Sequence, residues 1–214
     1  DTAGYAVALA ASMKHIYMGN PGETYFSTSD IGWVVGHSYI IYGPLIAGMA
    51  TVMYEGTPLR PDAGIWWKIC QDQEVTVMFS APTAIRVLKK QDPAFLKKYD
   101  LSKLRALYCA GEPMDETSHQ WMMDELGIPV IARYWPTETG WAMLSLMPGV
   151  ENNAVQLGSP GFPAYGFDVR LFRDDGSECG ANEKGIVGVV PPLPPGCLST
   201  IWGDDKRFVS TYFT

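Results

Sequence analysis

The sequence has few of the residues that build metal centres or disulfide frameworks. Its 214 residues include only four cysteines and three histidines. No two cysteines form a CxxC pair, and the histidines do not cluster with them. These spacings argue against a structural zinc site and favour reduced, intracellular thiols. Cys109 lies within an apolar run, so we expect it to be a small buried hydrophobic side chain and not a nucleophile.

The sequence also lacks a basic stripe and a cleavable leader. The formal net charge is −7, and lysine and arginine are scattered apart from short pairs such as Lys89-Lys90 and Lys97-Lys98. This distribution argues against nucleic acid as the main partner. The first ten residues contain no basic cluster, so we expect no signal peptide.

One long stretch contains no charged residue at all. Residues 31–54 include no Asp, Glu, Lys or Arg, and their number is sufficient to span a bilayer. Four glycines and a proline interrupt the stretch. We therefore interpret it as a loop, a buried helix and a buried strand over residues 50–54, and we expect no membrane association.

Strand-like and helix-like runs alternate between residues 24 and 148. The strand-like runs are residues 52–54, 75–79, 104–109 and 128–134, and the helix-like runs are residues 63–73, 81–91 and 115–126. A further helix, capped by Asp1 and Thr2, is predicted to reach about Met18. This alternation predicts an α/β fold over residues 1–150, in which flanking helices cover a mostly parallel sheet.

The amino-acid composition changes after residue 150. Residues 151–214 are rich in Gly and Pro, and strand-like runs at 168–172 and 185–190 are separated by the turn Asp174-Asp175-Gly176. This pattern predicts a second, small antiparallel β subdomain. The run PPLPPG at 191–196 is expected to be a stiff loop and not a polyproline ligand.

The segment RYWPTETGW, residues 133–141, contains three consecutive polar side chains that could bind a ligand. It places the hydroxyl of Thr137, the carboxylate of Glu138 and the hydroxyl of Thr139 in succession, directly after a predicted buried strand. The carboxyl end of such a strand is where open α/β sheets bind ligands. Hard oxygen ligands suit a nucleotide phosphate and its magnesium. A capping turn, in which Thr137 and Glu138 only bind backbone donors, is the alternative.

Four ordered motifs resemble those of the adenylate-forming acyl-CoA synthetases, in particular the short-chain branch that acts on acetate and propionate. The motifs are DIGWVVGHSYIIYGPL at 30–45, FSAPTAIR at 79–86, CAGEPMD at 109–115 and YWPTETG at 134–140. The final stretch, PLPPGCLSTIWGDDKRFVSTYF, is similar to the propionate-activating members. The resemblance implies a ligase that uses ATP and Mg²⁺ to form an acyl-adenylate and then transfers the acyl group to coenzyme A. Its partners would be these small molecules, and its location the cytoplasm, or the mitochondrial matrix if the source is eukaryotic.

The resemblance also implies roles for individual residues. Gly111, Glu112 and Pro113 would form a backbone shelf beside the adenine, and Ala81 would line the route of the coenzyme A thiol. Glu138 would bind magnesium and would act with Thr137, which contacts the α-phosphate, in catalysis. The nucleotide-binding residues of this motif would be Arg133, Tyr134, Trp135, Pro136 and Thr137.

The resemblance places Val34, Val35, Ala110 and Trp135 around the acyl group. Acetate enzymes usually have threonine at the position of Val35 and valine at that of Ala110. The smaller Ala110 would admit one more carbon, and a buried methylene contributes roughly 0.8 kcal/mol, within a pocket discrimination of about 1–3 kcal/mol. We therefore expect propionate to be preferred over acetate, modestly. The alternative is that Val34 and Val35 are ordinary core residues.

Departures from the family pattern keep other functions open. Ala132 and Arg133 stand where the family usually has an aspartate or a related polar pair, and Pro136 stands where it usually has glutamine. The phosphate loop is expected before Asp1, and the ribose-binding aspartate and the mobile domain after Thr214, so we expect an internal fragment that is inactive alone. An acetate or butyrate ligase, or a non-catalytic nucleotide-binding or scaffold module, is the alternative. A hydrolase is disfavoured because no GxSxG motif occurs.

Overall fold

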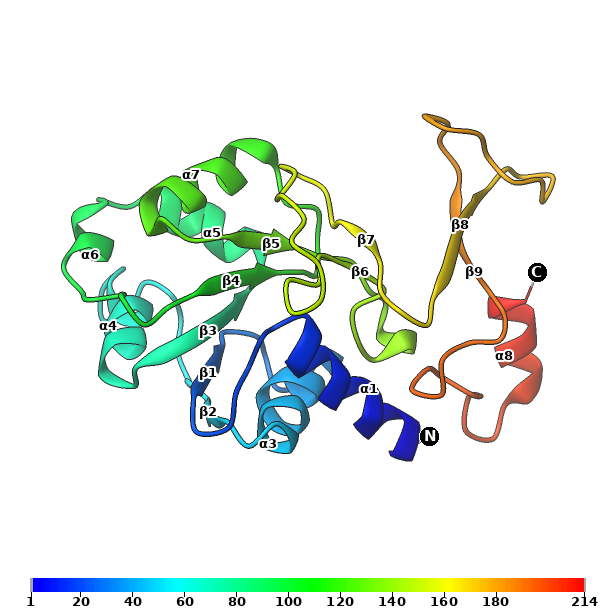
Figure 1. The fold of residues 1–214 in the computed structure, drawn as a ribbon, viewed down its shortest axis with the longest axis horizontal. Helices are drawn as coiled ribbons and strands as arrows, with labels where there is room; N and C mark the ends of the chain where they lie inside the picture. The colour runs from blue at the N-terminus through cyan, green and yellow to red at the C-terminus, as the bar shows by residue number, and fades with distance from the viewer. Residues whose placement is uncertain (1, 214) are drawn as a thin grey trace.

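The computed structural model describes residues 2–213, and its centre is a parallel sheet (Figure 1). Five strands lie in the order β2-β1-β3-β4-β5, and each neighbouring pair is parallel. The strands are β1 (Thr24–Ser27), β2 (Ala50–Val52), β3 (Val75–Ser80), β4 (Ala106–Cys109) and β5 (Val130–Ala132). The predicted α/β fold is therefore confirmed. Strand β1, which pairs with both β2 and β3, was not among the predicted strands.

Helices cover both faces of the sheet. Figure 1 shows α1 and α3 on one side of the sheet and α5 and α7 on the other. The helices of this region are α1 (Thr2–His15), α2 (Val34–Gly36), η1 (His37–Tyr42), α3 (Gly43–Ile46), α4 (Ile65–Asp72), α5 (Pro82–Lys89), α6 (Ala94–Lys97) and α7 (Glu116–Leu126). The three longer helices predicted over 63–73, 81–91 and 115–126 are confirmed, with ends displaced by at most two residues. Helix α1 ends three residues before the predicted Met18, and Asp1 lies outside the described residues.

Alternate residues of each strand face two different cores. In β3, Val77 and Phe79 belong to the core beneath α1, whereas Met78 belongs to the core beneath α4, α5 and α7. In β4, Tyr108 faces the first core and Leu107 the second. Successive side chains of a strand point to opposite faces, so a strand buried on both faces is apolar throughout. This explains why the apolar runs of β3 and β4 were recognised from the sequence.

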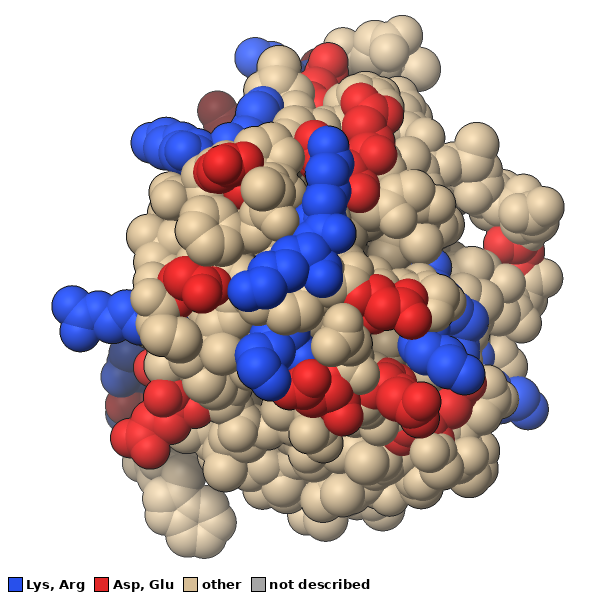
Figure 2. All heavy atoms as spheres, turned by 90° about the vertical axis from the view of Figure 1, so that its left-hand side faces the viewer, with Lys and Arg blue, Asp and Glu red and all other residues tan. Residues whose placement is uncertain are grey.

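The uncharged stretch at 31–54 folds as broken pieces. It comprises a loop, the short helices α2, η1 and α3, and then β2, which begins at Ala50 as predicted but ends at Val52. The prediction of a buried strand over 50–54 was wrong, because Ala50 is exposed and the other two residues of β2 are only half-buried. Among residues 2–213 we find no helix with the length and apolar character needed to cross a membrane. On the face shown in Figure 2, lysines and arginines are interspersed with acidic residues.

Strands β8 (Asp168–Phe172) and β9 (Ile186–Val190) and the last helix lie to one side of the layered body (Figure 1). The two strands form an antiparallel pair, as predicted. Helix α8 (Asp205–Tyr212) follows and was not predicted. The short strands β6 (Leu144–Ser145) and β7 (Phe162–Pro163) pair across residue 150. The division of the chain at that residue stays a prediction.

The cysteines are free thiols in this fold. Cys70 and Cys109 are buried, and burial raises the pKa of each thiol to about 12. A thiol with so high a pKa is almost entirely protonated near neutral pH and is a poor nucleophile. Cys109 is thus the small buried hydrophobic side chain that its apolar surroundings predicted.

Candidate functional site

The motif residues that follow β3, β4 and β5 lie side by side at one edge of the sheet. The register pairs Ser80 of β3 with Cys109 of β4, and Cys109 with Ala132 of β5. These three residues end their strands, so the motif residues that follow them leave the sheet at the same edge. The following residues are Ala81, Ala110 and Arg133. Segments far apart in the sequence therefore meet at the carboxyl edge, where open α/β sheets bind their ligands.

The shelf faces a cleft of about 390 Å³ that Tyr134 and Trp135 also line. Gly111 has a φ of +103°, and a Cβ added there would meet open space. Only glycine adopts this conformation without strain, and the missing side chain leaves the backbone open to a ligand. We call this space the shelf cleft. The two segments predicted to bind nucleotide thus border the same cleft, although whether nucleotide binds there stays a prediction.

The turn η2 (Thr137–Thr139) presents the polar residues of the motif. The hydroxyl of Thr139 lies 3.0 Å from the carbonyl oxygen of Pro136 and 2.9 Å from that of Trp141. Thr139 is therefore occupied by local structure. Thr137 is exposed, and the N-cap position of this turn is taken by Pro136, which forms no side-chain capping hydrogen bond. The arrangement differs from the capping-turn alternative, because the residue that stabilises the turn is Thr139.

Gly140 closes this turn in a left-handed conformation, with a φ of +75°. A Cβ at this position would lie 2.9 Å from a ring atom of Tyr5 in α1. The hydroxyl of Ser38 donates a hydrogen bond of 2.6 Å to the Gly140 carbonyl oxygen. The glycine of the motif is thus required both by its backbone conformation and by close packing against α1.

Glu138 has a partner that the sequence did not reveal. The hydroxyl of Tyr212 in α8 donates a hydrogen bond of 2.7 Å to its carboxylate, which raises the pKa of Tyr212. Glu138 also borders a cleft of about 500 Å³ together with Thr137 and Val34. Among residues 2–213 no group of three or more His, Cys, Asp or Glu side chains is arranged for a metal ion. Glu138 is therefore a single carboxylate beside a hydroxyl and not part of a protein-only metal cage.

The residues predicted to surround the acyl group are divided between neighbouring places. Ala110 is buried in the core beneath α1, and Val35 and Trp135 pack against that same core. The Trp135 ring meets the Tyr39 ring edge-on, with centroids 5.4 Å apart. Val34 instead lines the cleft that contains Thr137. Three of the four residues thus border one apolar region, and their enclosure of an acyl chain stays a prediction.

Arg133 borders the shelf cleft, but its guanidinium lies within an aromatic cage. The residue is 4% exposed, and its side-chain nitrogens have no hydrogen-bond partner among the described residues. The guanidinium carbon lies near the ring centroids of Tyr17 (4.1 Å), Phe79 (4.5 Å), Tyr108 (4.8 Å) and Tyr39 (5.6 Å). The negative faces of these rings stabilise the charge in place of a carboxylate. The sequence offered one signal, because Arg133 lies two residues after Ile131 and so shares its face of the sheet.

Ala81 stands at the start of α5, directly after β3. Its backbone is extended, with φ −105° and ψ 145°, and Pro82 occupies the first position of the helix. The methyl group is small and only partly buried. Its predicted place beside a coenzyme A route stays a prediction.

Comparison with known proteins shows the family of this chain. The sequence profile described as AMP-binding enzyme matches residues 2–190. The chain belongs to this family of AMP-binding enzymes.

Individual relatives show which members of the family this chain is similar to. The chain is 56% identical to the propionate–CoA ligase of Salmonella typhimurium and 55% identical to that of Escherichia coli, each over the whole chain. It is 40% identical, over 99% of its length, to the human mitochondrial acyl-CoA synthetase short-chain family member 3. The chain spans 34% of the length of each of the two bacterial ligases.

Proposed function

We propose that the complete protein containing this chain is a propionate–CoA ligase. It joins propionate to ATP, forms propionyl-adenylate and pyrophosphate, and then transfers the propionyl group to coenzyme A with release of AMP. The observation that carries the proposal is the convergence of the shelf, Ala81 and the YWPTETG segment at one sheet edge, in a chain that is 56% identical to a propionate–CoA ligase.

The residues at this edge suit the two steps chemically. In the first step a carboxylate oxygen attacks the α-phosphorus and pyrophosphate leaves. In the second, the coenzyme A thiolate attacks the acyl carbon and AMP leaves. Negative charge accumulates on phosphate oxygens, and donors that are already oriented stabilise it most effectively. The exposed hydroxyl of Thr137 is our candidate donor to the α-phosphate, the open backbone at Gly111 receives the adenine, and the small Ala81 leaves room for the thiol.

Glu138 is the residue of this chain that would hold Mg²⁺. Magnesium is commonly held by one or two carboxylates together with substrate phosphates and waters, so a single carboxylate beside a hydroxyl fits it. When bound, the ion neutralises phosphate charge. The hydrogen bond from Tyr212 orients the carboxylate of Glu138 from the side of α8.

Pro136 is compatible with this function despite its departure from the family pattern. Its backbone has φ −84° and ψ 163°, an extended conformation that proline adopts readily. The turn that presents Thr137 therefore forms with proline in place of glutamine. This supports the enzyme over a non-catalytic nucleotide-binding or scaffold module, the alternative of another class. We propose a cytoplasmic location, with the mitochondrial matrix as the alternative.

Acid-dependent ATP–pyrophosphate exchange by the purified complete protein tests the proposal. We expect kcat/KM for propionate to exceed that for acetate by about tenfold, because Ala110 leaves room for one more carbon. Butyrate should be the poorer substrate because the Trp135 ring limits the pocket. A higher kcat/KM for acetate or butyrate would identify that acid as the preferred substrate. Nucleotide binding without exchange for any of the three acids would indicate a binding module.

A further inference from the structure

Helix α5 begins without a capping side chain of its own. Its N-cap is Ala81, whose methyl group cannot accept a hydrogen bond, and Pro82 has no N–H to donate. The first free donor is therefore the backbone N–H of Thr83, which donates a hydrogen bond of 2.8 Å to the carboxylate of Glu112. An unpaired donor at a helix start is normally satisfied by the N-cap residue itself. Here a residue of the shelf supplies the cap from another segment.

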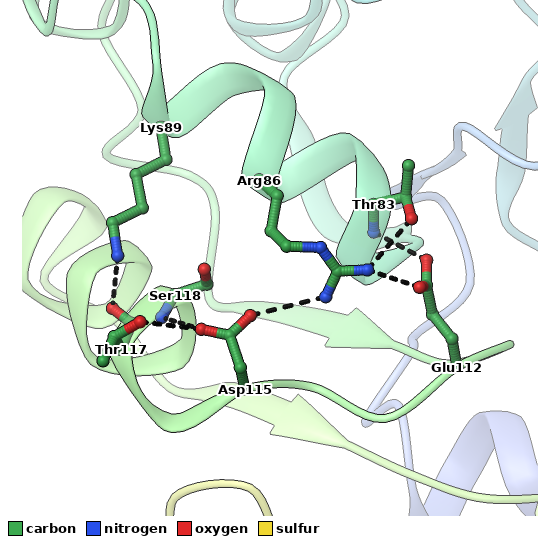
Figure 3. A network of polar contacts seen from close by, with 7 residues as sticks. All are labelled: Thr83, Arg86, Lys89, Glu112, Asp115, Thr117 and Ser118. Carbon is green, nitrogen blue, oxygen red and sulfur yellow. Dashed lines mark hydrogen bonds and ion pairs between the residues drawn. The ribbon is translucent and has the colours of Figure 1, made fainter.

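Arg86, one turn along α5, holds the same carboxylate. Its guanidinium forms an ion pair with Glu112 and donates a hydrogen bond of 3.0 Å to the hydroxyl of Thr83 (Figure 3). The two ion-pair side chains are 36% and 34% exposed. Partial burial disfavours the charged form of Glu112, but the hydrogen bonds from Thr83 and Arg86 outweigh it and lower its pKa. The carboxylate of Glu112 is thus directed to α5 and leaves only its backbone for the shelf.

The carboxylate of Asp115 fixes the C-terminal end of the loop that carries the shelf. Asp115 accepts a hydrogen bond of 2.8 Å from the N–H of Ser118 and thereby caps α7. Its other oxygen lies 3.4 Å from Arg86, and Lys89 donates a hydrogen bond of 2.9 Å to the carbonyl oxygen of Thr117. Figure 3 shows these residues bridging α5 and α7. The loop that carries the shelf is therefore held at both ends by one arginine.

We propose that Arg86 is a positioning residue that holds the shelf in its nucleotide-binding geometry; this inference rests on the proposed function. Gly111 has no side chain to restrain the backbone of the shelf, and nothing lies within 4 Å of the place that a Cβ would occupy. Arg86 restrains the next residue, Glu112, against the helix that begins at Ala81. The adenine site and the wall of the coenzyme A route are thereby kept in one fixed relation.

The test compares Arg86→Met with Arg86→Lys in the complete protein. We expect Arg86→Met to raise KM for ATP and Kd for AMP, measured by calorimetry, by about threefold to thirtyfold, because hydrogen bonds to charged groups are lost. KM for propionate should change less than twofold. Arg86→Lys should restore only part of the loss, since a point charge cannot serve both carboxylates and Thr83.

Arg105→Met is the matched control. Arg105 forms a two-pronged ion pair with Glu23, its side chain is also 36% exposed, and both residues precede their strands at the opposite edge of the sheet. We expect it to leave the affinity for AMP and KM for ATP unchanged. Equal effects of the two substitutions, or an unchanged AMP affinity in Arg86→Met, would overturn the proposal.

A double-mutant cycle identifies the partner. Glu112→Gln keeps an acceptor for Thr83 but removes the charge that Arg86 binds. If the two residues act as one unit, the double variant should bind AMP no more weakly than Arg86→Met alone, whereas additive losses would contradict the clamp. If the unmodified protein shows no propionate-dependent exchange but only Arg86→Met weakens AMP binding, the proposed substrate fails and the positioning role stands.

Discussion

The layered region before residue 150 and the extended region after it use their apolar residues in opposite ways. All four residues of β4 and all three of β5 are buried. In contrast, β8, β9 and α8 contain no buried residue. Packing therefore dominates the stability of the first region, whereas backbone pairing and exposed ion pairs hold these later elements. Ala164, Phe167 and Cys197 still join the second region to the core beneath α1. Substitutions of the same type should have very different effects in the two regions.

A pair of tryptophans gives the largest expected contrast. Trp67 is 2% exposed in the core beneath α4, and Trp202 is 99% exposed after the β8–β9 hairpin. Trp67→Ala should lower the free energy of unfolding by about 3–5 kcal/mol, because it leaves a cavity. Trp202→Ala should change it by no more than about 0.5 kcal/mol. Denaturant unfolding of the complete protein measures both, and similar losses would remove the distinction between the regions.

Arg133 tests whether the aromatic cage accepts any cation. Lysine is more strongly hydrated than a guanidinium and loses its proton when buried. We expect Arg133→Lys to be less stable than Arg133→Met by about 2 kcal/mol at neutral pH. The unfolded lysine binds a proton that the folded one does not, so stability should rise with pH and the difference should shrink toward pH 10. A lysine variant as stable as the methionine variant would show that the cage also accepts an ammonium group.

The helix caps give the smallest contrast and depend on pH. Asp115 caps α7, which packs on the sheet, and Asp204 caps α8, which buries no residue. Asp115→Ala should cost about 1 kcal/mol at neutral pH. Asp204→Ala should only fray α8.

The stability that Asp115 contributes should fall as the pH is lowered. Hydrogen bonds from Thr117 and Ser118 lower the pKa of its carboxyl below the ordinary value. Its contribution is therefore complete above about pH 4 and is lost as the pH falls through the lowered folded value. The difference between the wild type and Asp115→Ala should shrink in acid, whereas Asp115→Asn should stay close to the wild type at neutral pH because asparagine also caps. A constant difference down to pH 2 would contradict this assignment.

Some strands could be predicted from the sequence and others could not. β3 and β4 were recognised because both of their faces are buried and their sequences are continuously apolar. β1 was missed because its sequence, TYFS, contains three hydroxyl residues and does not form a continuous apolar run. Its Ser27 is nevertheless 2% exposed, because β1 lies between two other strands. α8 was missed because its polar sequence has no core-facing side.

The sequence by itself determined the alternation of β3, α5, β4, α7 and β5, the polar motif at the end of the last of these strands and the family to which the chain belongs. These depend on local periodicity and on residue types at fixed spacing. Only the tertiary structure decided that Arg133 enters an aromatic cage, that Tyr212 reaches Glu138, and that Glu112 caps a helix 29 residues earlier in the chain. Such contacts join residues far apart in the sequence, and the direction of each side chain is set by the packing of whole elements, which no local pattern encodes.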